Sequence, residues 1–470
     1  MRARSTNWIL FPFLTTVLCT LALLPWTAQA GGPILVGGPS GLEGVPFTWD
    51  VSVPATYRVD GGPFARKPDG TVMVNNATGL VRVQAMFKVW EDVPTASITF
   101  SYAGPLQSAG SFTDGDVSTV EEYDAVIAAC NEGTQSAIIF DADGSIFQQL
   151  TGETAIIGFS GPCKLDPLTG RILSGMGMFN GLFRDGINTP ISYPANYELS
   201  QAEMDEVIAH EFGHFAGLDH SQINTEVLNQ GYPNCLTTDL AGLPLMFPFA
   251  ACQAKSTAGL PMLAPDDLAW VSKLCTGVTP PNHIPFSSRY GIISGTILFS
   301  DGVTPVQDLN VIARSTVNPR GIAVSAFSGY LFTNWLGQSV TGGSDGGSPY
   351  GSRNPLLMGS YDIPVPAGSY NAWVESVSPY FATTQVGPLY PPIPNPGPNE
   401  WWNQNESATD SVTDKTAVSI TAGTTVSHID IILNGTAPRF DAFESAQLWI
   451  HEPLLAWRRE ENLVLAPVRV

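Results

Sequence analysis

The sequence predicts an α+β fold for residues 31–280 and an all-β fold for residues 281–436. Helical patterns of apolar residues alternate with short strand patterns as far as about residue 280. Beyond a linker marked by Pro280, Pro281 and Pro285, the chain has the pattern of strands separated by Gly-, Ser- and Pro-rich turns. We therefore expect a sheet with helices in the first region and a β-sandwich in the second.

The composition is that of a folded protein rather than a disordered one. Hydrophobic residues make up 44% of the chain, so it can bury cores of ordinary size. Its 470 residues are too many for one such core and predict two or three domains. The 46 glycines and 38 prolines favour short strands and many turns over long helices.

Residues 1–30 have the pattern of a signal peptide. Arg2 and Arg4 precede an apolar run over residues 9–24, and small residues at 27–30 form a cleavage site. We therefore expect a secreted or extracytoplasmic protein. An uncleaved membrane anchor is the alternative, because the apolar run is long for a signal peptide. No other stretch is long and apolar enough to span a bilayer, so we expect no membrane span after cleavage.

The charge argues against two classes of partner. The formal net charge is −21 at pH 7, and the charged residues of the predicted signal peptide are all basic. An acidic surface repels phosphate groups, so we expect neither nucleic acid nor anionic membrane as a partner.

Five cysteines lie beyond the predicted signal peptide. An oxidising compartment would allow two disulfides and one free thiol. We predict the pairs Cys235–Cys252 and Cys130–Cys163, which leave Cys275 unpaired. The sequence alone leaves other pairings open.

Periodicity and turn signals predict the elements. Helices are expected over residues 79–92, 118–129, 200–217 and 265–274, and strands over 97–101 and 137–140. Residues 31–56 are rich in Gly and Pro and are expected to be extended. In the second region the clearest strands are expected over 292–298, 309–313, 361–365, 370–374, 417–420 and 428–433.

Half of the six histidines fall within eleven residues, in the segment Val207–Ser221. His210 and His214 are four residues apart on a predicted helix, so their side chains share one face and can reach one ion. Gly217 allows the chain to turn sharply, which brings His220 towards the same point. Three neutral nitrogens leave one coordination position open for water, as in a catalytic zinc (Zn²⁺) site.

This segment resembles the zinc-binding signature of the metzincin metallopeptidases, and Ser221 after the third histidine is typical of the matrixin-like branch. The run Leu-Met-Phe-Pro over residues 245–248 resembles the methionine turn of the same branch. Weaker similarity extends over residues 45–278. The resemblance implies a metzincin-type domain with a twisted mixed sheet.

The resemblance also implies roles for individual residues. His210, His214 and His220 would bind the zinc ion, and Glu211 would act as the general base. Met246 would form the floor of the site. Phe247 and Pro248 would wall the pocket for the side chain that follows the scissile bond.

The second region more loosely resembles a transthyretin-like or carboxypeptidase-regulatory β-sandwich. Gly295–Leu298, Asn310–Ala313 and Pro366–Tyr370 carry that likeness. The predicted organisation is therefore a signal peptide over 1–30, a metallopeptidase domain over 31–280, this sandwich over 281–436, and a disordered tail over 437–470.

The function implied is that of a secreted zinc endopeptidase acting on protein or peptide substrates. A non-catalytic surface or adhesion protein with a structural zinc site is the main alternative, and a hydrolase of non-peptide amides is another. Calcium (Ca²⁺) is a candidate ligand of Asp114–Asp116 or Asp141–Asp143. Plain turns explain these stretches more simply, because the spacing of an EF-hand loop is absent.

Overall fold

The structure is a computed structural model that describes residues 31–37, 44–152, 155–187, 198–231, 234–277, 284–332, 351–352, 354–378, 381, 386–389 and 394–435. The predicted signal peptide, most of the linker and the predicted tail lie outside the described residues.

The first region is built around one mixed five-stranded sheet with the strand order β4-β1-β5-β7-β6. The first four strands are parallel, and β6 pairs antiparallel with β7. The bounds are β1 Ala55–Val59, β4 Phe100–Pro105, β5 Ala137–Asp141, β6 Gly158–Asp166 and β7 Arg171–Asn180; a separate hairpin comprises β2 Ala65–Arg66 and β3 Val72–Val74. The mixed sheet expected from the resemblance is therefore present.

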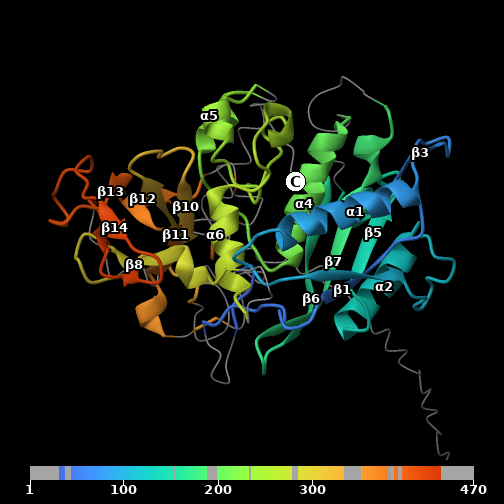
Figure 1. Ribbon diagram of the computed structural model, residues 1–470, viewed down its shortest axis with the longest axis horizontal. Helices are drawn as coiled ribbons and strands as arrows, with labels where there is room; N and C mark the ends of the chain where they lie inside the picture. The colour runs from blue at the N-terminus through green and yellow to red at the C-terminus, as the bar shows by residue number, and fades with distance from the viewer. Residues whose placement is uncertain are drawn as a thin grey trace, which may run out of the picture.

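The helices are α1 Asn76–Glu91, α2 Val120–Glu132, α3 Ser145–Thr151, α4 Gln201–Phe215, α5 Thr237–Leu240 and α6 Pro265–Leu274. Five short 3₁₀ helices accompany them: η1 Gly181–Arg184, η2 Thr225–Asn229, η3 Lys255–Ala258, η4 Phe286–Ser288 and η5 Pro355–Leu357. In Figure 1, α1 and α4 lie across the sheet on the side facing the viewer. None of the helices in the described ranges combines the length and the apolar content needed to cross a bilayer.

Strand β5 shows why both faces of the sheet are covered. All five of its residues are buried, so apolar side chains point to both sides. Ile138 and Phe140 pack in the core that contains α1 and α4. Ala137 and Ile139 pack in a second core with α2 and α3. The sheet is therefore a rigid platform with the helix α4 fixed to one face.

Some predicted elements were wrong in place or extent. The strand expected over 97–101 begins only at Phe100, because Ala96 and Ile98 are buried in the core while the chain is still turning from α1 into the sheet. The extended segment 31–56 leads into β1, which the sequence analysis missed. Most of the strand expected over 428–433 is irregular, since His428 has a positive φ of 65° and only Ile431–Ile432 pair.

The described residues from 284 to 435, here called the strand region, contain two sheets. One has the order β10-β9-β12-β13, with β14 also paired to β12, and the other has the order β11-β8-β15, with β16 also paired to β8. The bounds are β8 Tyr290–Leu298, β9 Leu309–Ser315, β10 Ala323–Phe327, β11 Ser360–Pro366, β12 Gly368–Ser376, β13 Glu400–Trp401, β14 Val418–Ile420, β15 Thr425–Val426 and β16 Ile431–Ile432. The predicted all-β content is present in these ranges, whereas the sandwich family stays a prediction.

Helix α6 joins the two regions, and Figure 1 shows it between them. The Trp270 indole nitrogen donates to the Ser325 carbonyl of β10 at 2.7 Å. Lys273, also on α6, forms an ion pair with Asp362 of β11. Both bonds are largely shielded from water, so α6 fixes the strand region against the first region.

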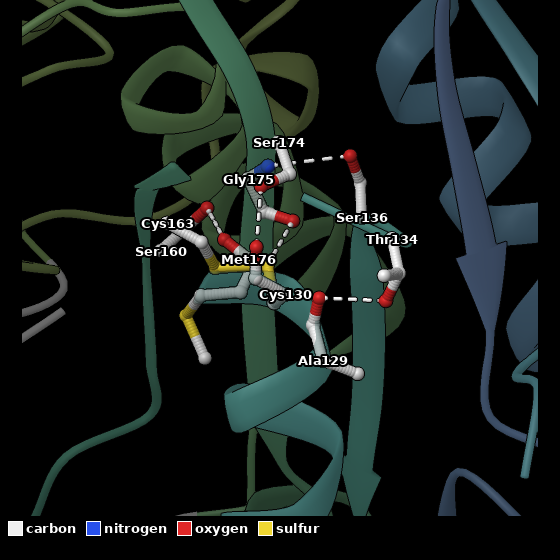
Figure 2. Close-up of a disulfide and its surroundings, with 9 residues drawn as sticks. All are labelled: Ala129, Cys130, Thr134, Ser136, Ser160, Cys163, Ser174, Gly175 and Met176. Atoms are coloured by element: carbon white, nitrogen blue, oxygen red, sulfur yellow. Dashed lines mark hydrogen bonds between the residues drawn. A yellow bond between two sulfur atoms is a disulfide. The ribbon is translucent and has the colours of Figure 1, made fainter. Parts of the chain in front are cut away.

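The two predicted disulfides are both present, and Cys275 is a buried free thiol. Figure 2 shows Cys130–Cys163, which ties the end of α2 to β6. The Ser174 hydroxyl donates to the Cys130 carbonyl at 2.6 Å, so β7 is held at the same point. This cross-link therefore fixes α2 to the sheet.

We expect the double substitution C130A/C163A to lower the free energy of unfolding by about 2–4 kcal/mol, because the disulfide restricts the unfolded chain over a separation of 33 residues. Denaturant unfolding of the variant and the wild type under oxidising conditions measures this. Reduced wild type should show a loss at least as large, because it loses both bridges. Equal stability of variant and wild type would contradict the prediction.

Candidate metal centre

Helix α4 carries two of the three clustered histidines, and its start is set by a capping box. The Glu203 amide donates to the Ser200 hydroxyl at 3.2 Å, and the Ser200 amide donates to the Glu203 carboxylate at 2.7 Å. The helix ends at Phe215, and Gly217 follows with φ 98°, a value that favours glycine. The predicted capping box and turn are therefore both present.

Helix α1 fixes the position of α4. The rings of Phe87 and Phe212 are stacked with their centroids 3.6 Å apart. The Trp90 indole nitrogen donates to the Ala209 carbonyl at 2.8 Å. Gly213 provides the close approach: a Cβ there would lie 2.9 Å from the Trp90 ring. The helix that carries His210 and His214 is thus held by packing and by a buried hydrogen bond.

The structure brings the three histidines together. Their ligand atoms all lie within 4.8 Å of one another, and they form the one such cluster among the described residues. The Nε2 atoms of His214 and His220 are 3.2 Å apart. Two nitrogens bound to one zinc ion at about 2.0–2.1 Å with a tetrahedral angle lie roughly 3.3–3.4 Å apart. The spacing therefore fits ligation of a single ion.

Backbone carbonyls orient two of the imidazole rings. The Nδ1 atom of His210 lies 2.7 Å from the Leu245 carbonyl, and the Nδ1 atom of His214 lies 2.9 Å from the Leu218 carbonyl. A carbonyl only accepts, so each Nδ1 carries the proton and each Nε2 presents a lone pair. The Nε2 atom of His210 has no hydrogen-bond partner among the described residues. This buried orphan atom fits a metal ligand.

Burial keeps these two imidazoles neutral, as ligation requires. Burial, together with the nearby His214, lowers the pKa of His210 to about 3. Burial lowers the pKa of His214 to about 4. At neutral pH both rings therefore offer lone pairs without first losing a proton.

Glu211 lies between the two helical histidines in sequence and is 1% exposed. Neither of its carboxylate oxygens has a hydrogen-bond partner among the described residues. Burial raises the pKa of Glu211 well above its ordinary value. A Cβ on Gly158 of β6 would lie 3.1 Å from the Glu211 Cγ, so the glycine makes room for this side chain. A buried carboxyl without partners is costly for stability and is typical of functional sites.

The predicted methionine turn lies directly below α4. Met246 is 2% exposed, and its sulfur would be 2.2 Å from a Cβ placed on Gly213. Asp267 of α6 fixes the turn, because its carboxylate accepts the amides of Leu245 at 2.8 Å and Met246 at 3.1 Å. The carbonyl of Leu245 also accepts from the His210 ring. Leu245 therefore links the Asp267 carboxylate to the metal centre.

A cavity opens beside His210. Of the two residues predicted to wall the substrate pocket, Phe247 lines this cavity and Pro248 does not. The lining is mainly apolar, and Glu206, Lys255 and the disulfide residue Cys252 also contribute to it. The full lining is Leu199, Glu203, Glu206, Val207, His210, Leu240, Leu243, Pro244, Leu245, Phe247, Phe249, Ala250, Ala251, Cys252, Gln253 and Lys255.

Comparison with known protein families gives one decisive match. Residues 65–241 match the model of the matrixin family, and this range contains the three histidines and Glu211. This part of the chain is a matrixin domain. The methionine turn and α6 lie beyond the matched range. A comparison with curated proteins gives no match.

Two solved structures of a pilin subunit show weak similarity to the chain. They are the major pilin subunit of Bacillus cereus and a substituted form of it, each at 14% identity with a TM-score of 0.16. The alignment covers 31% of this chain and 30% of the pilin chain. A likeness at that level carries no structural or functional conclusion.

The sequence predicted no role for two acidic residues, Asp219 within the matched range and Asp267 beyond it. Asp219 accepts the amide of His220 at 2.6 Å and is buried, with its second oxygen unpartnered among the described residues. Asp267 falls within the helix predicted over residues 265–274, and no other role was predicted for it. Asp267 contacts residues 21 and 22 positions away, which local patterns do not reveal, whereas Asp219 contacts the adjacent His220 and stands inside the histidine segment. Asp143 accepts the Ser145 amide and Asp141 accepts the Phe147 amide, both in the first turn of α3, and calcium binding there stays a prediction.

Glu206, which lines the cavity, should make the free energy of unfolding depend on pH. Burial raises the pKa of Glu206 from 4.5 to about 7. Between these values the folded chain holds a proton that the unfolded chain has lost, so the Glu206 contribution to stability falls as the pH rises. Replacing Glu206 by Gln keeps an acceptor for the Lys255 amide and removes this loss. Relative to wild type, E206Q should gain about 2 kcal/mol in unfolding free energy between about pH 5 and pH 7.

Denaturant unfolding of E206Q and wild type at several pH values measures this difference. A difference that stays constant with pH would show that Glu206 ionises normally in the folded state.

Proposed function

We propose that the protein is a secreted zinc-dependent endopeptidase that hydrolyses peptide bonds in proteins or peptides. The observation that carries the proposal is the convergence of three histidine nitrogens beside a buried, unpartnered glutamate within a matrixin domain. A purely structural metal site needs no acid–base group beside it, so Glu211 favours catalysis over a structural role.

His210, His214 and His220 would hold the zinc ion through their Nε2 atoms. Bound zinc with three nitrogen ligands would lower the pKa of a water molecule in its open position and polarise the substrate carbonyl. Met246 would keep the floor of the site apolar and closed to solvent, because it fills the space under Gly213.

Glu211 would act as the general base and then as the general acid. Its carboxylate would accept the proton of the attacking water and pass it to the departing amide nitrogen. Two features support this role: the carboxylate makes no competing hydrogen bond with described residues, and its raised pKa suits a group that must both take and release a proton. The positive charge of a bound zinc ion would favour the ionised form of Glu211 before the reaction.

Strand β6 and the cavity support a mode of substrate binding. β6 is the last strand of the described sheet order, and Gly158 at its start lies beside Glu211. An extended peptide could add to this edge with its scissile bond above α4. The side chain that follows the scissile bond would then enter the apolar cavity, with Phe247 as one wall.

We expect E211Q to bind zinc as wild type does and to lose peptide turnover by at least about 10³-fold, because an amide cannot accept the proton. Peptide-library cleavage and zinc content of the purified chain measure the two effects, with a chelated sample as a blank. The matched control is E121Q on α2, which replaces an exposed glutamate outside the histidine site and the cavity and should retain turnover. Substantial cleavage by E211Q would remove Glu211 from this role. Zinc binding without any cleavage by wild type would favour the non-catalytic alternative.

The same library should reveal a preference for the residue after the scissile bond. Because the cavity is mainly apolar, we expect peptides with Leu, Met or Phe at that position to have kcat/KM at least about tenfold above those with Asp or Glu. Replacing Leu243 by Trp should fill the cavity and shift the preference towards Ala and Ser. An unchanged preference in L243W would place the side chain elsewhere.

A further inference from the structure

The segment that follows the third histidine makes most of its side-chain contacts with the strand region, although Asn224 also donates to the Asp239 carbonyl of the matrixin domain at 3.2 Å. Gln222 is the clearest case. Its side-chain nitrogen donates to Glu375 at 2.8 Å and to the Ser376 carbonyl at 2.9 Å, and its side-chain oxygen accepts the Ser378 amide at 2.7 Å. Its backbone carbonyl accepts from the Asn310 side chain at 2.8 Å. The nitrogen and oxygen of the Gln222 side chain are therefore both bonded, and the partners in all four bonds belong to β9, β12 or the residues after β12.

The next two residues continue this docking. Ile223 is completely buried in a small apolar cluster with Ile312 of β9 and Ala323 of β10. Asn224 adopts a left-handed conformation with φ 54°, which favours asparagine among residues with side chains. Its side chain accepts from Arg314 of β9 at 3.0 Å and donates to the Arg320 carbonyl at 3.0 Å.

Ser221 makes the contact closest to the metal centre. Its hydroxyl lies 3.0 Å from the Ser325 hydroxyl of β10. The Ser325 amide donates to Asp266 of α6 at 2.8 Å, so the two serines and the aspartate form one buried polar group. The Ser221 amide in turn donates to the Met246 carbonyl at 2.8 Å. The strand region thus reaches the residue adjacent to His220.

The three histidines are held in different ways. His210 and His214 are fixed by α4 and by its packing on α1. His220 lies outside any helix or strand, on the loop after Gly217. On one side of this loop, the Ile34 amide donates to the Gly217 carbonyl at 2.8 Å and the Asp219 amide to the Gly32 carbonyl at 3.1 Å. On the other side, residues 221–224 attach to the strand region.

We propose that the sheet β10-β9-β12 positions the third zinc ligand, and that Asn310 and Ser325 are positioning residues of the metal centre. The strand region is then a component of the peptidase site rather than an independent attachment module. This inference rests on the proposed zinc site. Groups that orient a ligand from outside the coordination sphere typically change metal affinity or activity about 10–100-fold when removed.

These contacts are buried, so losing one of them costs more free energy than losing an exposed hydrogen bond. Gln222, Asn310 and Ser325 are at most 1% exposed. Removing one partner leaves a buried polar group unsatisfied, at a cost of about 1–3 kcal/mol. The loop can relieve that cost only by moving to reach water or a new partner. Such a movement displaces His220, because Ser221 and Gln222 follow it directly.

The test uses the full chain with N310A, S325A and the combined N310A/S325A. The matched control is S328A: its buried hydroxyl donates to the Val306 carbonyl at 2.7 Å and accepts the Leu309 amide at 3.0 Å, within the strand region but away from residues 221–224. Zinc affinity is measured by competition with a chromogenic chelator. The visible spectrum of the Co²⁺-substituted protein reports ligand geometry, and thermal unfolding reports the fold.

We expect N310A/S325A to weaken zinc binding at least about tenfold, to alter the Co²⁺ spectrum and to lower kcat more than it changes KM. S328A should lose thermal stability with the zinc Kd and the Co²⁺ spectrum of wild type. If the double variant does not fold, each single variant carries the same comparison at about threefold or more.

Folded N310A, S325A or double variants with the zinc Kd and Co²⁺ spectrum of wild type would overturn the positioning role. An equal weakening in S328A would overturn it too, because the effect would then follow stability alone. Failure of wild type to bind zinc would instead overturn the proposed function.

Discussion

The metal centre depends on the hydrogen bonds that the carbonyls of Leu245 and Leu218 accept from His210 and His214. These bonds decide which nitrogen of each ring carries the proton, and therefore which nitrogen points to the shared position. Leu218 belongs to the loop after Gly217, and Leu245 belongs to the methionine turn. Helix, loop and turn are thus one unit in which no part can move without turning an imidazole.

Two buried ionisable residues, Asp267 and Lys255, fix the methionine turn of this unit. The Asp267 carboxylate accepts hydrogen bonds from the methionine turn. Burial raises the pKa of Asp267, and the nearby buried Lys255 ammonium partly offsets that rise. Lys255 donates to the carbonyls of Leu243 and Met262, so its ammonium is satisfied without a direct carboxylate contact. Buried charges of this kind are costly to separate, so they define one geometry for the turn.

Local signals in the sequence were enough to predict the parts of the site that lie on one helix. The capping box at Ser200, the four-residue spacing of His210 and His214, and the turn at Gly217 all follow from local stereochemistry. The cysteine pairs were also predicted correctly. The docking of residues 221–224 could not be predicted, because no local pattern singles out Gln222 and its partners lie 88 to 156 residues away in the sequence. β10 was missed because its run Ala-Val-Ser-Ala-Phe has only one β-branched residue and two alanines, which gives a weak strand signal.

The docking of Gln222 has a consequence for the order in which the protein acquires its structure. Glu375 follows Gln222 by 153 residues, so a growing chain has completed α4 and the histidine loop long before the partners of that loop exist. Contacts of such long sequence separation form late in folding. During synthesis, the loop that carries His220 therefore lacks its contacts with β12 until that strand has emerged from the ribosome. Chain order itself would therefore delay completion of the three-histidine site.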